Sequence, residues 1–134
     1  MNKLSLIPAA TVLMIRDIDD EIEVLMVKRS KKPPFENLFV FPGGKIDEAD
    51  KDINISNLCD GLDDKEASRK LGLSHGGLSY WVACVRECFE EVGILLAKKI
   101  NGKDLDLTGF EKEKYDKYRD KLIRNEISLS LIHI

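Results

Sequence analysis

Cysteine and histidine are scarce in this chain and positive charge is not in excess, and each of these features argues against a class of protein. The 134 residues contain an odd number of cysteines, Cys59, Cys84 and Cys88, which argues against a disulfide framework and favours a reducing compartment. The two histidines lie at no ligand-like spacing from them, so zinc is not indicated. A net charge of −3 gives no electrostatic basis for binding nucleic acid.

Long apolar runs are missing too. The first 17 residues, MNKLSLIPAATVLMIRD, have an apolar stretch that is too short to span a bilayer. They also lack the basic start and small-residue cleavage site of a signal peptide. We therefore expect a cytoplasmic protein without a membrane partner. With 43% apolar and 34% charged residues, the composition is that of a globular protein, and the length fits a single domain over 1–134.

The first third of the chain has the pattern of strands. Residues 5–16 and 21–29 are rich in apolar and β-branched side chains, and the acidic segment 17–20 predicts a turn between them. A loop around Pro33 and Pro34 separates them from a short strand at 39–41.

The rest of the chain is mainly helical in pattern. A short helix is predicted near 63–71, ended by Gly72, within the polar segment 45–78. A longer helix is predicted over 80–92, with Ser79 as its N-cap and Gly93 as its stop. A strand at 94–100, a turn at Asn101-Gly102 and a charged, solvated helix at 109–124 follow.

The stretch FPGGKIDEAD, residues 41–50, joins a strand end to two glycines and three acids. Gly43 and Gly44 permit a tight turn, or the close approach of another group to the backbone. The acids that follow indicate that this group carries positive charge.

The helix predicted over 80–92 has two chemically different faces. At roughly 100° per residue, the side chains that cluster on one side, to pack on the sheet, are Trp81, Val85, Cys88 and Val92. Glu87, Glu90 and Glu91 cluster on the opposite side, near the C-terminal end that disfavours negative charge. A solvated acidic face is one interpretation. The other is a site for Mg²⁺ or Mn²⁺, because these cations prefer oxygen ligands.

These residues resemble the Nudix hydrolase superfamily. RECFEEVGI, residues 86–94, is similar to the second half of the Nudix box at every defined position, and residues 44–50 resemble the first half. In most members the halves are contiguous, which would place Arg-Glu at 58–59, whereas here the pair arrives 28 residues later, at 86–87. The chain thus resembles the branch whose box carries a long insertion, here about 51–78, similar to the peroxisomal coenzyme A diphosphatase. The implied fold is an α/β/α sandwich with a mixed sheet.

The resemblance also implies a site. Gly44 would lend its backbone carbonyl to a bound Mg²⁺ or Mn²⁺, and the carboxylates would come from Glu87, Glu90, Glu91 and Asp50. Arg86 would orient these acids by ion pairing. Glu87 is the first candidate for the general base.

The implied reaction is hydrolysis of a pyrophosphate bond in a small nucleoside diphosphate derivative, with coenzyme A or acyl-coenzyme A as the leading substrate. Nucleotide sugars, dinucleoside polyphosphates and oxidised nucleotides are alternatives, as is a Nudix-like binding module without activity. Homodimers are common in the superfamily, which leaves a homodimer open here.

Three further expectations concern regions outside the box. Arg29, in a locally basic stretch with Lys28, Lys31 and Lys32, either contacts a substrate phosphate or is an ordinary strand-end charge. The insertion either caps the site or is an inert loop. Superfamily members have further strands and a helix after the box. We therefore expect a C-terminally truncated fold in which the ending ISLSLIHI has no partner.

Overall fold

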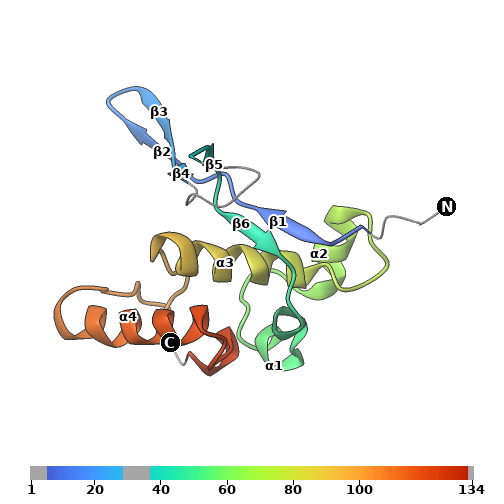
Figure 1. Ribbon diagram of the computed structural model, residues 1–134. Helices are drawn as coiled ribbons and strands as arrows, with labels where there is room; N and C mark the ends of the chain where they lie inside the picture. The colour runs from blue at the N-terminus through green and yellow to red at the C-terminus, as the bar shows by residue number, and fades with distance from the viewer. Residues whose placement is uncertain (1–5, 29–36, 133–134) are drawn as a thin grey trace.

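The computed structural model describes residues 6–28 and 37–132, and within them six short strands lead into a mainly helical second part (Figure 1). The strands are β1 (Ala9–Thr11), β2 (Ile15–Ile18), β3 (Glu21–Val24), β4 (Val27–Lys28), β5 (Phe39–Val40) and β6 (Gly43–Lys45). The helices are α1 (Ile53–Ser56), α2 (Asp64–Leu71), α3 (Leu78–Val92) and α4 (Gly109–Ile123), with 3-10 turns η1 (Glu48–Lys51) and η2 (Leu129–Leu131).

The strands form three antiparallel pairs, β1 with β6, β2 with β3, and β4 with β5. Each of the two long strands expected from the sequence divides in two, although backbone bonds continue across the breaks, from Val12 N to Pro42 O at 2.8 Å and from Leu25 N to Met14 O at 2.9 Å. The turn predicted over 17–20 contains only Asp19 and Asp20. Both adopt positive φ, as a tight hairpin requires.

The α/β class is confirmed, but the described residues contain antiparallel pairs alone and so do not show the expected mixed sheet. The strand predicted at 94–100 does not form. It is reduced to one antiparallel bridge between Lys98 and Asp104, which flank the predicted turn. Leu95, at its start, is buried among helical side chains instead.

Helix α3 runs through the middle of the molecule, with the β1–β6 pair over one side and α4 along another (Figure 1). It begins after Gly77, two residues earlier than predicted, and Ser79 Oγ donates to Gly76 O instead of capping the helix. Gly93 ends it in the left-handed conformation (φ 72°), as predicted.

The prediction of which α3 side chains are buried is partly wrong. Cys88 is buried, but Trp81 is 36% exposed, and Val82, Ala83 and Phe89 are buried in its place. The reason is that α3 contacts a strand pair, α2 and α4 at once. Its buried surface is therefore wider than the single stripe expected of a helix with one packing partner.

Two apolar clusters form the core. The first core cluster joins α3 to α4 and consists of Phe89, Leu95, Tyr115, Leu122 and Ile132. The second core cluster joins α3 to the insertion and consists of Ile55, Ala67, Leu78 and Val82. The insertion is thus packed against the N-terminal half of α3, whereas the acids lie in the C-terminal half.

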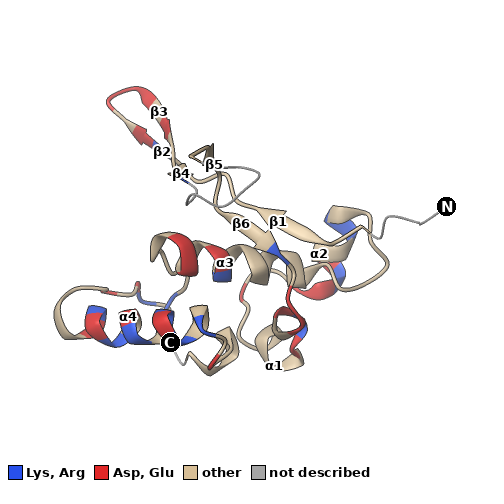
Figure 2. Cartoon of the chain, in the orientation of Figure 1, with Lys and Arg blue, Asp and Glu red and all other residues tan. Residues whose placement is uncertain are grey.

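Some of the C-terminal apolar residues have partners, contrary to the expectation, although Leu131 is 56% exposed and Ile134 lies outside the described residues. Ile132 is 2% exposed in the first core cluster, and Leu129 packs against both clusters. Helix α4 is rich in charged residues, as predicted (Figure 2), and its exposed positions include Lys112, Glu113, Asp116 and Lys117. In the described part of the chain, no helix is long and apolar enough to cross a membrane.

Candidate metal site

The two halves of the split box meet at a buried ion pair. Arg86 Nε donates to Asp50 Oδ1 at 2.9 Å and Arg86 Nη2 to Asp50 Oδ2 at 3.0 Å, although 36 residues separate them. The two side chains are 6% and 1% exposed. Asp50 Oδ2 also accepts from the backbone N–H of Asp47 at 2.8 Å, which closes η1. The insertion therefore leaves and re-enters the fold without separating the acid from its arginine.

Arg86 also organises the acidic face of α3. Its Nη1 donates to Glu87 Oε1 at 2.9 Å and lies 3.4 Å from both carboxylate oxygens of Glu90. Its Nη2 donates to the carbonyl of Lys45 at 2.9 Å, which ties α3 to the end of β6. One guanidinium thus holds two acids of the helix and the strand beside it.

The glycines of β6 bring the strand backbone against those acids. A Cβ on Gly44 would lie 2.1 Å from Glu87 Oε1, and a Cβ on Gly43 would lie 2.4 Å from Ala10 O in the paired strand. The amide of Gly43 donates to Glu91 Oε2 at 3.2 Å. Close approach, one of the two interpretations of this pair of glycines, is thus the one that the structure supports, because both lie in β6, where a Cβ on Gly43 would clash with the backbone of β1 and a Cβ on Gly44 would displace the Glu87 carboxylate.

Burial changes the acidity of the site. Desolvation raises the pKa of Glu87, against the lowering effect of Arg86, and nearby Glu91 and Asp47 raise it further. Desolvation likewise raises the pKa of Glu90, again opposed by Arg86. Burial would lower the pKa of Arg86, but the hydrogen bond and charge of Asp50, and then the charges of Glu87 and Glu90, raise it above its ordinary value.

The residues fit a divalent cation in their chemistry. Glu87, Glu90 and Glu91 offer oxygen atoms beside the backbone of Gly44, and two of these acids are partly desolvated, so a bound cation would relieve them. Among residues 6–28 and 37–132, no three side chains of the Asp, Glu, His or Cys type stand close enough together to hold a metal. Arg86 draws Glu87 and Glu90 inward, so coordination requires these side chains to turn toward the ion.

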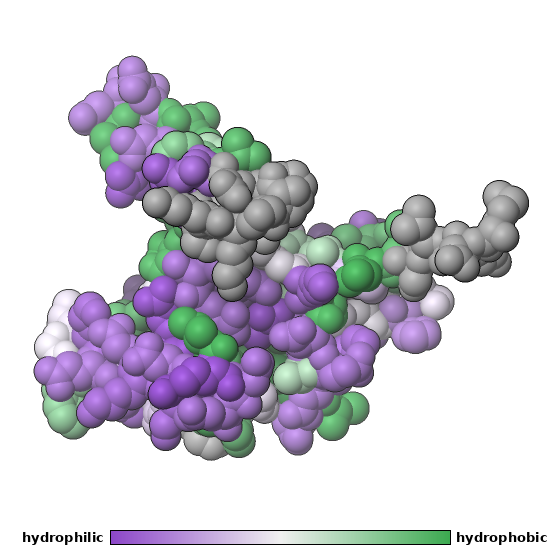
Figure 3. Space-filling view, in the orientation of Figure 1, coloured by the Kyte–Doolittle hydropathy of each residue, from purple (hydrophilic) through white to green (hydrophobic). Residues whose placement is uncertain are grey.

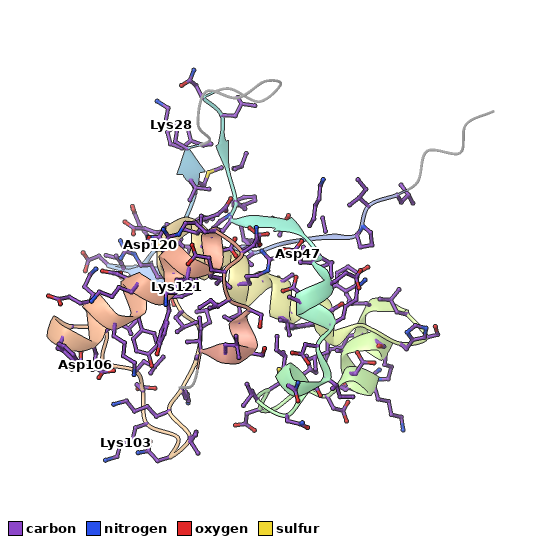
Figure 4. The ribbon with its side chains drawn as sticks, turned by 60° about the horizontal axis from the view of Figure 1, so that its bottom comes forward. Lys28, Asp47, Lys103, Asp106, Asp120 and Lys121 are labelled. Atoms are coloured by element: carbon purple, nitrogen blue, oxygen red, sulfur yellow. The ribbon has the colours of Figure 1, made fainter. Side chains whose placement is uncertain are left out.

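The structure treats the remaining candidates differently. Both oxygens of Asp50 accept from Arg86, which makes Asp50 a support for the arginine, and its predicted part as a metal ligand stays a prediction. Arg29 lies outside the described residues. Lys28 stands on the projecting strands, apart from Asp47 beside α3 (Figure 4).

One residue at the site was missed. Arg119 of α4 donates from Nε and Nη2 to the carbonyl of Glu90, at 3.0 and 2.7 Å. Its position in a run of charged residues at 109–124 indicated only a solvated helix, and no local pattern marks it as different from its neighbours.

A helix with an acidic face against a glycine-bearing strand, inside an α/β fold, defines the class of protein. The chain belongs to the NUDIX domain family, whose model matches residues 6–132. It is similar to a solved structure, a NUDIX hydrolase from Alicyclobacillus acidocaldarius, with 25% identity and a TM-score of 0.62, covering 92% of this chain and 54% of that one.

Among curated proteins, the chain is 34% identical over 132 residues to the Acyl-coenzyme A diphosphatase NUDT19 of Xenopus laevis. The match covers 78% of this chain and 35% of that protein. The chain therefore corresponds to a minor part of that relative's length.

Proposed function

We propose that this chain hydrolyses the phosphoanhydride bond of a nucleoside-diphosphate-linked substrate in the presence of a divalent cation, with coenzyme A or acyl-coenzyme A as the substrate. The observation that carries the proposal is the meeting of Gly44, Glu87 and Glu90 around a buried Arg86–Asp50 pair. Membership of the NUDIX domain family supports the reaction class, and the acyl-coenzyme A diphosphatase activity for which the Xenopus laevis relative is named supports the substrate.

The ligands that we assign to Mg²⁺ or Mn²⁺ are the carboxylates of Glu87, Glu90 and Glu91 and the backbone carbonyl of Gly44. A cation held there would supply positive charge to the pyrophosphate and would lower the pKa of a bound water. Asp50 is not among the ligands, because Arg86 occupies both of its oxygens. Its part is to fix the arginine.

The protein residues would contribute position and a proton acceptor. Arg86 orients the carboxylates of Glu87 and Glu90, because its own guanidinium is held in place by Asp50 and by the carbonyl of Lys45. Glu87 is our candidate general base, because its carboxylate lies against the backbone of Gly44, where the cation and its water would be held.

Glu90→Gln tests the proposal at a single ligand. The amide keeps the size of the side chain, and Arg86 keeps Asp50 and Glu87 as partners, so the variant should fold. We expect Mn²⁺-dependent release of phosphate products from coenzyme A to fall by roughly 100-fold or more. The readout is product analysis by liquid chromatography, with Glu113→Gln on the exposed surface of α4 as the matched control.

The same assay decides the substrate. A panel of coenzyme A, acyl-coenzyme A, nucleotide sugars, dinucleoside polyphosphates and oxidised nucleotides is run with each metal. Preferential turnover of a compound without coenzyme A would overturn the substrate and keep the reaction. Wild-type turnover in Glu90→Gln would remove Glu90 from the site, and an inactive wild-type chain that binds Mn²⁺ would support the binding-module alternative.

A further inference from the structure

Arg119 reaches from α4 to the last turn of α3. Its Nε and Nη2 both donate to the carbonyl oxygen of Glu90, at 3.0 and 2.7 Å. In a continuing helix this carbonyl would accept from the amide of Ile94, but α3 ends at Val92 and the chain turns away at Gly93. Arg119 therefore supplies the partner that the end of the helix removes.

Arg119 lies on the packed face of α4 and not on its solvated face. Tyr115 and Leu122, four residues before it and three after it, are 4% and 3% exposed in the first core cluster. A guanidinium on such a face needs a hydrogen-bonding partner to offset its desolvation, and Glu90 O is that partner. The apolar contacts of α4 with Phe89 thus fix where the charge of Arg119 falls.

The contact bears on the carboxylates because Glu90 is held at two points. Its carbonyl is bound by Arg119, while its side chain faces Arg86 on α3. Arg119 also lies against the C-cap, where its Nη1 is 3.6 Å from the place a Cβ would take on Gly93. A cation at a helix C-terminus is favourable, and here it offsets the unfavourable position of the acids noted in the sequence.

We propose that Arg119 is a positioning residue for the metal site: by binding Glu90 O it fixes the rotation of the last turn of α3, and with it the directions in which Glu90 and Glu91 present their carboxylates. It touches neither cation nor substrate. This inference rests on the proposed function, since it assigns a purpose to a contact behind the same acids.

The test measures metal binding directly, from the electron paramagnetic resonance signal of free Mn²⁺, in the wild-type chain and in Arg119→Met. Circular dichroism first confirms that both are folded at the temperature used. We expect the affinity for Mn²⁺ to fall about tenfold, the lower end for groups that orient a metal ligand. Arg119→Lys keeps the positive charge but can make only one of the two hydrogen bonds to Glu90 O, so it should recover part of the lost affinity. The control is Lys117→Met at an exposed position of α4, which should bind Mn²⁺ as the wild type does.

A second readout separates positioning from simple stabilisation. In Arg119→Met the Mn²⁺ concentration for half-maximal turnover should rise by the same factor, while turnover at saturating Mn²⁺ should recover toward the wild-type value. If Arg119→Met does not fold, Arg119→Gln is judged by the same criteria.

The outcomes distinguish the two proposals. A wild-type chain that does not bind Mn²⁺ overturns the proposed function and this inference together. A folded variant that melts earlier but binds Mn²⁺ as tightly as the wild type overturns the inference alone and leaves Arg119 as a packing contact between α3 and α4.

Discussion

At the scale of single residues, Arg86 is the side chain on which most of the site depends. It is a buried cation with acidic partners from η1 and from its own helix. Such a pair adds little stability compared with an apolar pair of the same size, but removing one member leaves the other charge buried without compensation. The exposed ion pairs of this chain, such as Glu48 with Lys51, lack that property because water solvates whatever remains.

This difference predicts unequal costs for two acid-to-alanine changes in the same 3-10 turn. Asp50→Ala should lower the free energy of unfolding by about 3–5 kcal/mol. Glu48→Ala, whose side chain is 90% exposed, should lower it by less than about 1 kcal/mol. Urea denaturation of both variants provides the measurement, and equal losses would contradict the buried role of Asp50.

The raised pKa values of Glu87 and Glu90 predict how stability varies with pH. The folded chain holds these protons more tightly than the unfolded chain does, so their contribution is present below the ordinary value of 4.5 and is lost as pH rises through the raised pKa. Hydrogen bonds from the Leu78 and Gly76 amides lower the pKa of Asp64 from its ordinary value of 3.8. Its contribution to the free energy of unfolding is therefore lost at lower pH, as the pH falls below 3.8.

We therefore expect the metal-free free energy of unfolding to fall with pH just above 4.5, and to fall less steeply in Glu90→Gln. Urea denaturation at a series of pH values with a chelator present measures both slopes. Added Mn²⁺ should oppose the fall in the wild-type chain, because a metal binds the deprotonated carboxylates. A variant with an unchanged slope would show that burial does not perturb Glu90.

At the scale of elements, the insertion provides the N-terminal support of α3. The carboxylate of Asp64 in α2 accepts from the amides of Gly76 and Leu78, at 2.9 Å each, and Ser68 Oγ accepts from Gly77 N at 2.8 Å. A Cβ on Gly77 would lie 2.3 Å from Ser68 N, so the segment returns to α3 in direct backbone contact with α2. The insertion is therefore part of the core, and its action as a cap over the site stays a prediction.

The cap provided by Asp64 has a measurable value. Asp64→Ala leaves two amides at the start of α3 without their partner and should cost about 1–2 kcal/mol, as the loss of a strong N-cap does. Asp60→Ala, an exposed acid earlier in the same segment, should change the free energy of unfolding little. Thermal and urea unfolding of the two variants decide the point, and a neutral Asp64→Ala would place the support of α3 elsewhere.

At the scale of the whole molecule, apolar surface is unevenly distributed. The helical part encloses both core clusters, whereas the strands β2 to β5 project from it and expose apolar side chains (Figures 1 and 3). Among these, Ile15, Ile22 and Phe39 are each more than half exposed, at 62%, 67% and 62%. Exposed apolar strands with free edges are sites of association between molecules.

We expect the chain to self-associate through these strands. Ile22→Lys should shift the sedimentation behaviour of concentrated samples toward monomer, because a charge on the exposed face opposes burial there. Ile100→Lys, at a 95% exposed position outside the strands, is the control and should leave association unchanged. Equal effects of the two changes would indicate general hydrophobicity instead of a defined surface, and the homodimer stays a prediction until then.

The sequence by itself determined the features that depend on near neighbours. The helices predicted near 63–71, at 80–92 and at 109–124 form with ends shifted by one or two residues, and the stops at Gly72 and Gly93 and the acidic face of α3 follow from spacing within a few residues, whereas the predicted cap at Ser79 does not form. The second half-box, which is itself local, also singled out Arg86 through its resemblance to the Nudix motif.

Tertiary structure alone decided the contacts between distant segments. The reach of Arg119 to Glu90, the exposure of Trp81 and the burial of Ile132 join or separate residues that no local pattern marks. Each depends on which surfaces of α3 are covered by other elements. A periodic pattern records that a helix has a buried face, but how wide that face is, and which charged side chain from another helix can reach it, are set by the packing of the whole chain.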